Sequence, residues 1–452
     1  MTNNKLSAKT KVGAGIADLG GNVFFSVINF WLMYYMTDMV GISAAAAGIS
    51  IMIGKMWDAV TDPLMGYISD NTTGKRGRRR PYMVIGLLPL ALSFVAFFTK
   101  VEIGRPMLLC VYYTMLYCLI NTFYTIIFVP YYSLLNEITK DYHERTSLQS
   151  VRMLFALLGN IVGSVLAQPI IGLFPNERVG FTGMAVIFSA VIAAAVMVTV
   201  LTTREPTVKS TAVKVRAGSF FRSYFSVFKN KPYCITVTVM TLCFFSLVVS
   251  QTTVPYFFKY YLGQEEMATL GILAAALGCI AGIPFVLYMS KRHGKKNAWI
   301  AEMLIALAGS LAVYIVAPMG VLPVVIAFCI FGLGSAGTYV LLMSVVADCA
   351  DSDYAETGEK KEGLFVGSTT FLQKLGMALG AAVVGWVLNG LGYIADQPQP
   401  EQVMNGIRIL QTLLPLVLNA AAMAILFFYP ITEEKFDEIK KKIALLEQSK
   451  TE

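Results

Sequence analysis

The chain has 452 residues, of which 56% are hydrophobic and 14% are charged. Because soluble domains carry about 25% charged residues, this chain has too few polar side chains to cover a water-soluble core, and its composition excludes a soluble globular protein. Its net charge of +8 would fit a nucleic-acid-binding protein, but the positions of the basic residues, described below, argue against that class.

Long apolar segments recur from one end of the chain to the other, and each is long enough for a helix to cross a bilayer. They predict about twelve membrane-spanning helices, and therefore an all-α membrane protein. In chain order, the expected helices cover residues 12–37, 44–67, 81–100, 107–134, 149–172, 180–203, 233–262, 267–290, 297–317, 321–347, 362–390 and 405–429.

The longest polar interruption, from Thr202 to Pro232, contains seven basic residues and divides these helices into two groups of six. Gly66 and Gly282 each precede a basic cluster at corresponding positions of the two groups, which is a weak internal repeat. Two related bundles are typical of secondary transporters. The expected regions are an N-terminal bundle at 1–203, a central cytoplasmic loop at 204–232, a C-terminal bundle at 233–429 and a cytoplasmic tail at 430–452.

The basic residues are distributed unevenly between the two sides of the expected membrane protein. If both termini are cytoplasmic, 28 of the 36 Lys and Arg residues lie inside, five lie outside, and Lys55, Arg152 and Lys374 lie within helices. This asymmetry follows the positive-inside rule. It predicts a multi-pass protein of the cell inner membrane with both termini in the cytoplasm, and it explains the net charge without nucleic acid.

The cysteines and the N-terminus predict no further chemistry. The seven cysteines are an odd number and form no CxxC pair, so neither a disulfide framework nor a cysteine metal site follows. The first 15 residues lack the short apolar core and small-residue cleavage site of a removable signal peptide. We expect no cofactor.

Glycines at four-residue spacing occur in two of the expected helices. Gly159 and Gly163 lie in the fifth, and Gly376 and Gly380 lie in the eleventh. Such pairs let two membrane helices approach closely. Glycine is also common in membrane helices without that role, so the spacing alone leaves both interpretations open.

Charged residues that remain inside the apolar segments are the first candidates for function, because each costs about 2.5 to 3.5 kcal/mol at mid-bilayer on insertion scales. Lys55, Asp58 and Asp62 lie on one helix face, since steps of three, four and seven residues bring side chains together. Two carboxylates one turn apart can bind one small cation or share a proton. The alternative is a static ion-pair network. The full set is Asp18, Lys55, Asp58, Asp62, Arg152 and Lys374.

Motifs around these charges resemble a known family. They are Trp57-Asp58-Ala-Val-Thr-Asp62-Pro63-Leu-Met-Gly66, the basic loop from Gly74 to Pro81, Val129-Pro130-Tyr131-Tyr132-Ser133-Leu134, Val346-Ala347-Asp348 and the closing Phe428-Tyr429-Pro430, together with Asp18 and Lys374. Over nearly its whole length the chain is similar to the glycoside/pentoside/hexuronide:cation symporters of the major facilitator superfamily, and among these to melibiose permease and the bacterial glucuronide carrier. The resemblance implies twelve transmembrane helices in two pseudo-symmetric six-helix bundles.

Residue by residue, the resemblance implies that Asp58 and Asp62 bind the cation, with Thr61 and Thr125 as neighbouring oxygen ligands. Thr61 replaces an asparagine of melibiose permease, so the choice between Na⁺ and H⁺ stays open. Phe128 replaces an aspartate that anchors galactosides, and we do not expect galactoside transport by the same contacts. The positions that resemble the sugar site, or the link between sugar and cation, are Asp18, Phe128, Tyr132, Arg152, Tyr339 and Lys374.

Two other functions fit parts of the sequence. Asp348, Asp351, Asp353 and Glu356 form an acidic cluster at an expected helix end, and intramembrane prenyltransferases hold magnesium and diphosphate with paired acidic motifs. Such an enzyme needs two motifs, whereas a single cluster also fits a latch that pairs with basic cytoplasmic loops. A drug exporter of the same superfamily would have an aromatic cavity without the paired aspartates.

We therefore predict a monomeric, non-enzymatic symporter that imports a sugar conjugate with Na⁺ or H⁺, in contact with membrane lipid and without nucleic acid. Lys374 should lie close to Asp58 and Asp62, because an unpaired ammonium in the apolar interior would lose its proton or disrupt packing. Since Phe128 removes one acid while Arg152 and Lys374 remain, an acidic sugar should be tolerated better than by a galactoside carrier. The competing interpretation is that Phe128 stacks on a neutral pyranose or pentoside.

Overall fold

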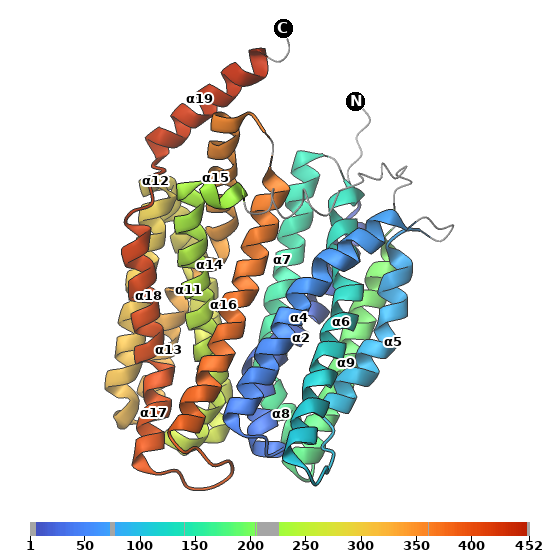
Figure 1. Cartoon of the computed structure of the whole chain (residues 1–452), viewed down its shortest axis with the longest axis vertical. Helices are drawn as coiled ribbons and strands as arrows, with labels where there is room; N and C mark the ends of the chain where they lie inside the picture. Colours follow the sequence, from blue (N-terminus) through green and yellow to red (C-terminus); the bar gives the residue numbers. More distant parts are fainter. Residues whose placement is uncertain are drawn as a thin grey trace. The chain divides into compact units, whose positions relative to one another are not determined.

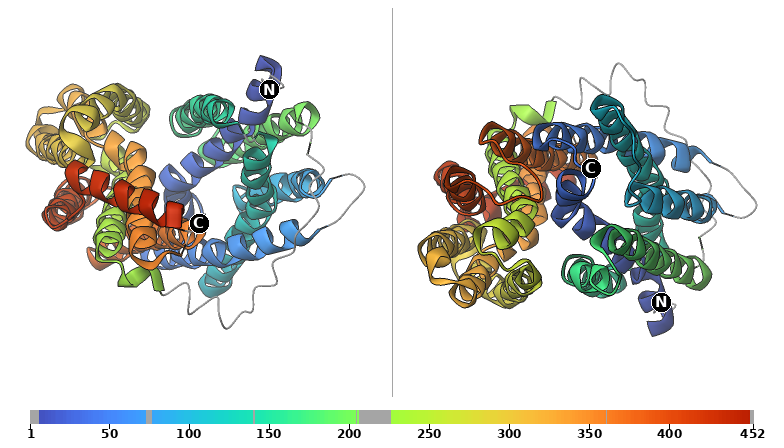
Figure 2. Two further views of the ribbon diagram at one scale, coloured as in Figure 1. Left: turned by 90° about the horizontal axis from the view of Figure 1, so that it is seen from above. Right: turned by 90° about the horizontal axis from the view of Figure 1, so that it is seen from below.

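The computed structural model describes residues 6–72, 77–139, 141–203, 205, 226–359 and 361–449, and nearly all of them are helical (Figure 1). Most of the expected central loop at 204–232, and Lys75 and Arg76 of the basic loop, lie outside the described residues. The contacts between residues divide the chain into two compact units, and end-on views show the helices of each unit side by side (Figure 2).

The first unit holds the described residues up to 205 together with Val384–Pro398. Its helices are α1 (Ala8–Gly15), α2 (Ala17–Phe30), α3 (Leu32–Tyr34), the π-helix η1 (Tyr35–Met39), α4 (Ala44–Asn71), α5 (Arg80–Phe97), α6 (Pro106–Ile138), α7 (Tyr142–Val165), α8 (Ala167–Ile171) and α9 (Glu177–Thr202).

The second unit holds the described residues from 226 to 383 and from 399 onward. Its helices are η2 (Val227–Lys229), α11 (Lys231–Tyr256), the π-helix η3 (Phe257–Tyr261), η4 (Glu265–Met267), α12 (Ala268–Val316), η5 (Ala317–Met319), α13 (Val321–Leu333), α14 (Ala336–Val340), α15 (Leu342–Thr357), most of α16 (Glu362–Gly390), α17 (Glu401–Gln411), α18 (Leu413–Leu426) and α19 (Glu433–Ser449).

Ten helices among the described residues are long and apolar enough to cross a membrane. α4 is not among these ten, although it has 28 residues. α12 has 49 residues and would be roughly 74 Å long if it were straight, more than twice the ~30 Å hydrocarbon core. Gly294 interrupts it with φ 79° and ψ 161°, a backbone conformation that favours glycine. The two helices expected at 267–290 and 297–317 meet at this turn, and the count of twelve crossings stays a prediction.

Polar side chains set where several of these helices begin. Asn176 and Asn230 each accept a hydrogen bond of 2.9 Å from the backbone N–H three residues later, at the starts of α9 and α11. Asp141 does the same for α7 at 2.9 Å. Each cap satisfies a backbone donor that the helix itself leaves open, which is worth about 1 kcal/mol.

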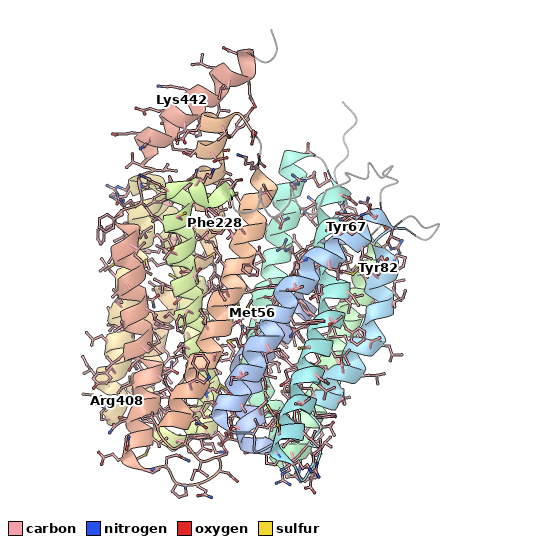
Figure 3. The ribbon with its side chains drawn as sticks, viewed as in Figure 1. Met56, Tyr67, Tyr82, Phe228, Arg408 and Lys442 are labelled. Atoms are coloured by element: carbon pink, nitrogen blue, oxygen red, sulfur yellow. The ribbon has the colours of Figure 1, made fainter. Side chains whose placement is uncertain are left out.

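Large apolar side chains lie exposed along the outer faces of both units. In α5, Ile85, Leu88 and Leu92 are all more than half exposed and recur at helical spacing. Lipid covers such a face in a membrane protein. Figure 3 shows Arg408 and Phe228 at opposite ends of the second unit, so that the charged guanidinium lies at one end of the apolar span.

Glycines bring helices into close contact in the first unit. A Cβ atom on Gly163 of α7 would lie 2.5 Å from the Val23 carbonyl oxygen of α2, and one on Gly159 would lie closer still to the Leu19 carbonyl oxygen. Packed side chains do not approach backbone atoms so closely. The close-approach interpretation of this glycine pair is therefore confirmed.

The second unit uses the same device. Cβ atoms on Gly376 and Gly380 of α16 would lie 2.5 and 2.9 Å from the carbonyl oxygens of Thr241 and Phe245 in α11. The two glycine pairs thus hold corresponding helices of the two bundles together, which agrees with the expected internal repeat.

We expect Gly159→Ala to destabilise the first unit. The added methyl group meets the Leu19 backbone, which cannot rotate away, and overpacking of this kind costs about 1 to 3 kcal/mol. Gly172→Ala is the control, because the nearest atoms to its Cβ would lie 3.6 Å away. Thermal unfolding in detergent should show a lower midpoint for Gly159→Ala only. Equal midpoints would show that this contact does not stabilise the packing of α7 on α2.

Candidate functional site

Oxygen-bearing side chains converge between α4 and α6 in the first unit. The Oγ1 atom of Thr125 lies 3.0 Å from a carboxylate oxygen of Asp58 and 2.9 Å from a carboxylate oxygen of Asp62. Thr61 lies beside them, with its Oγ1 3.5 Å from that of Thr125. Asp58, Thr61 and Thr125 are buried. All four residues that the resemblance implies as cation ligands are therefore adjacent.

A hydroxyl between two carboxylates has a chemical consequence. Thr125 has one proton to donate, so it cannot donate fully to Asp58 and Asp62 at the same time. The other contact becomes favourable when that carboxyl carries a proton or when a cation lies among the oxygens. Carboxylate and hydroxyl oxygens are the ligands that hard cations prefer. The arrangement therefore fits a small cation or a proton.

Neighbouring polar contacts position α4 for this role. Lys55, one turn before Asp58, donates a hydrogen bond of 3.1 Å to the side-chain oxygen of Asn29 in α2. Asn121 of α6 donates to the Gly54 carbonyl at 3.3 Å, and a Cβ atom on Gly54 would collide with the Tyr117 ring. The small residue lets α4 and α6 approach closely, which brings the carboxylates to Thr125.

Asp18 of α2 and Arg152 of α7 form an ion pair, with 2.7 Å between Arg152 Nε and Asp18 Oδ2. The Tyr131 hydroxyl donates to the same carboxylate at 3.0 Å. The guanidinium lies 5.0 Å from the centre of the Tyr132 ring and donates to Gln149 at 2.9 Å. The Asp18 side chain is 2% exposed and that of Arg152 is 30% exposed, so the pair is accessible from the arginine side.

Sequence reasoning did not include Tyr131 and Gln149 in the site. Tyr131 lies within the quoted motif from Val129 to Leu134, but the resemblance selected its neighbour Tyr132. Gln149 lies three residues before Arg152, one turn along the same helix, and this spacing could have predicted their contact.

Phe128 lies within an aromatic stack. It is 1% exposed, and its ring centre lies 4.3 Å from that of Tyr124, which in turn stacks on Phe24 at 4.6 Å. Gly21 provides the space, since a Cβ there would lie 2.7 Å from the Phe128 ring. In this conformation Phe128 supports the helices around the site, and a contact with a sugar requires the stack to open.

The other two residues implied for the sugar site belong to the second unit. Tyr339 of α14 is 46% exposed and contacts Phe244 edge to face, with ring centres 6.2 Å apart. Lys374 is half-buried near the middle of α16. Its expected proximity to the carboxylates of the first unit stays a prediction.

Glu302 of α12 is a buried acid that the sequence analysis missed. It lies inside the helix expected at 297–317, yet it is absent from the six charges selected above. The sequence feature that could have identified it is a single carboxylate directly before the long apolar run that begins at Met303.

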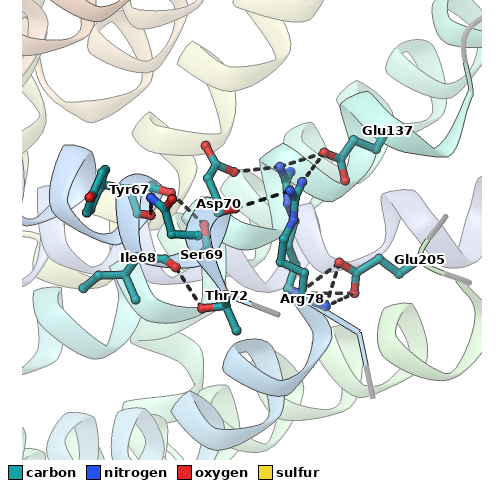
Figure 4. Close-up of polar contacts among 11 residues, drawn as sticks. Tyr67, Ile68, Ser69, Asp70, Thr72, Arg78, Glu137 and Glu205 are labelled. Atoms are coloured by element: carbon teal, nitrogen blue, oxygen red, sulfur yellow. Dashed lines mark hydrogen bonds and ion pairs between the residues drawn. The ribbon is translucent and has the colours of Figure 1, made fainter. Parts of the chain in front are cut away.

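The loop between α4 and α5 carries a separate charge cluster (Figure 4). Glu137 of α6 lies 2.5 Å from Arg78 and 2.8 Å from Arg79, and Arg79 also lies 2.9 Å from Asp70. The Glu205 carboxylate accepts the backbone N–H groups of Arg78 and Arg79 at 2.9 to 3.1 Å. Burial lowers the pKa of the Arg79 guanidinium, and the carboxylates of Glu137 and Asp70 oppose this effect. The cluster therefore ties the basic loop to α6.

The acidic cluster of the second unit is also paired with basic residues. Asp348 lies 2.7 Å from Lys295, and Asp353 lies 3.5 Å from Lys361. Within the described ranges, no three His, Cys, Asp or Glu side chains gather in a way that could hold a metal ion. These contacts favour the latch over a magnesium site.

Residues 13–433 match the family model described as MFS/sugar transport protein. The chain belongs to this family. The glucuronide carrier protein homolog of Escherichia coli (strain K12) is 28% identical, over 98% of this chain and 96% of its own length. Inner membrane symporter YicJ of the same organism is 26% identical over the same shares of the two chains.

The fold is that of solved transporters. The crystal structure of nucleoside transporter NupG covers 94% of this chain and 100% of its own, with a TM-score of 0.65 and 15% identity. The all-α membrane fold of the major facilitator superfamily is therefore confirmed, as is a transporter rather than an enzyme. The prenyltransferase alternative is wrong, because the whole matched region belongs to a transporter family.

Glu137→Gln should weaken the charge cluster around Arg79. The Arg79 side chain is 6% exposed, and a buried charge that loses a charged partner costs about 1 to 3 kcal/mol. Asp437→Asn is the control, since its pair with Lys440 is exposed on both sides and such pairs contribute at most about 1 kcal/mol. A lower thermal midpoint is expected for Glu137→Gln only. A wild-type midpoint would mean that the cluster adds no stability.

Proposed function

We propose that this protein imports a sugar conjugate, such as a glycoside, pentoside or hexuronide, across the cell inner membrane together with Na⁺ or H⁺. The match to a sugar-transport family and the names of its relatives support this function. The observation that carries ion coupling is the Thr125 hydroxyl between the Asp58 and Asp62 carboxylates. We also propose that both termini are cytoplasmic and that one chain suffices for transport.

In this mechanism α6 connects the ion site with the sugar site. Thr125 contacts the paired aspartates, and Tyr131, six residues later on the same helix, contacts Asp18. This separation is roughly 9 Å along the helix axis. When an ion binds, it neutralises charge at Asp58 and Asp62, and a shift of α6 then changes the contacts of Asp18 and Arg152. The resulting link makes sugar binding depend on the ion and permits alternating access.

Asp58→Asn and Asp62→Asn are each expected to abolish gradient-driven accumulation while the protein stays folded, because each removes a ligand charge from the ion site. Thr125→Val should reduce accumulation about tenfold, since a hydrogen bond to a charged group contributes about 1.5 kcal/mol or more. Thr125→Ser, which keeps the hydroxyl, should resemble the wild type.

The measurement is uptake of labelled glycosides, pentosides and hexuronides into vesicles with an imposed Na⁺ or H⁺ gradient. The gradient that drives accumulation identifies the ion. Normal accumulation by both asparagine variants would refute the assignment of the ion site.

The charge of the sugar is tested through Arg152. A sugar carboxylate can replace Asp18 as the partner of the exposed guanidinium, so Arg152→Gln should weaken competition by glucuronides about tenfold or more relative to neutral glucosides. Asp18→Asn frees the arginine and should shift the ranking towards glucuronides. If neutral xylosides or glucosides compete far better in the wild type, and Arg152→Gln leaves the ranking unchanged, the neutral-sugar interpretation of Phe128 is correct instead.

A further inference from the structure

Glu302 is a buried carboxyl that the proposed coupling mechanism does not use. It is 1% exposed, and among the described glutamates it alone is fully buried. Neither of its carboxyl oxygens has a side-chain hydrogen-bond partner within the part of the chain that the structure describes, and only the backbone N–H groups of Ala336 and Gly337 face it. Two neutral backbone donors offset the loss of hydration of a negative charge only in part.

The backbone of α14 packs directly against this carboxyl. A Cβ atom placed on Gly337 would collide with a Glu302 carboxyl oxygen, so only glycine leaves room for the acid at this position. The helix neighbours Trp299, Met303 and Ala306 are buried as well. The contact surface around the carboxyl is thus apolar side chains and peptide backbone.

The titratable side chains around Glu302 supply no positive charge. α12 packs against α13, α14 and α18, and it also contacts α11. The thiols of Cys243 on α11 and Cys279 earlier in α12 are close enough to interact with it electrostatically. α13 adds Cys329, α14 adds Tyr339, and α18 has no titratable residue. Thiols and phenols are never cationic, so none of these groups can form an ion pair with a carboxylate.

An ionised carboxylate without a counter-ion is very costly in an apolar interior, and the neutral acid is far less so. We propose that Glu302 is a proton-binding site in the second unit, occupied in this conformation and separate from the Asp58 and Asp62 pair. The proposal goes beyond symport itself, because Glu302 holds its proton whichever ion drives import.

The helix that covers Glu302 is interrupted on both sides of the contact. α13 ends at Leu333, α14 spans only Ala336–Val340, and α15 begins at Leu342. Irregular backbone at membrane depth occurs where it is buried in protein or lines a cavity, and breaks of this kind let a short segment move separately. Displacement of α14 would expose the carboxyl to water and allow the proton to leave. Proton release is therefore linked to the position of α14.

Infrared spectroscopy of the purified protein, without sugar, tests this proposal. Incorporation of ¹³C-labelled glutamate lowers the C=O stretching frequency of protonated glutamic acid and leaves aspartic acid unchanged. At neutral pH we expect a protonated-carboxyl band that moves with the label and is lost in Glu302→Gln. Glu266→Gln removes an exposed glutamate of the same unit and should keep the band.

The labelled wild type makes the test independent of whether the glutamine variant folds. A wild-type spectrum without a label-sensitive protonated-carboxyl band would overturn the proposal, because Glu302 would then be ionised and hold another cation. Persistence of the band in folded Glu302→Gln would also overturn it. In Glu302→Asp, the label-sensitive band should be replaced by a protonated-carboxyl band whose frequency does not change with ¹³C-labelled glutamate. No sugar or gradient is used, so this result and the transport result can fail separately.

Discussion

The cost of placing charge in an apolar interior governs this structure. Each charged side chain in a membrane span requires a partner, a bound ion or a proton, since lipid offers none. In the first unit Asp18 forms an ion pair with Arg152 and accepts a hydrogen bond from Tyr131, and Lys55 donates a hydrogen bond to Asn29. Glu302 in the second unit lacks a side-chain hydrogen-bond partner among the described residues. Charged side chains that have a partner within the protein hold helices together. Charged side chains without one are the places where a cation or a proton can bind.

Close helix packing makes these pairings possible. Gly159 and Gly163 bring α7 against α2, which places Arg152 beside Asp18. Gly54 has the same effect between α4 and α6, where Thr125 reaches the aspartates. The glycines therefore contribute to the chemistry as well as to the packing. Where a backbone carbonyl of one helix contacts a glycine of another, only a few relative rotations of the two helices fit, and these rotations fix which polar side chains meet. In the second unit, Gly337 has the corresponding relation to Glu302.

The ends of the helices show the internal repeat in a second way. In the first unit, Arg78 and Arg79 of the loop that follows α4 pair with Glu137 of α6. In the second unit, Lys295 pairs with Asp348 just after the turn at Gly294. Both clusters join a basic segment after the second helix of a bundle to an acid on another helix. The sequence predicted both basic segments and the acidic cluster that contains Asp348, but the pairing of Glu137 with Arg78 and Arg79 had no local signal.

What the sequence by itself determined is the class of protein and the residues that lipid does not tolerate, because hydropathy, charge asymmetry and helical spacing are local properties of the chain. Helical spacing selected Asp58 and Asp62 as an ion site, the family resemblance added Thr61 and Thr125, and the structure brings the four residues together. Only the tertiary structure decided which charges meet. It pairs Asp18 with Arg152 and Tyr131, encloses Phe128 in an aromatic stack and buries Glu302 against Gly337. Such partners depend on the rotation and depth of packed helices, which are set by long-range contacts and leave no periodic pattern in the sequence.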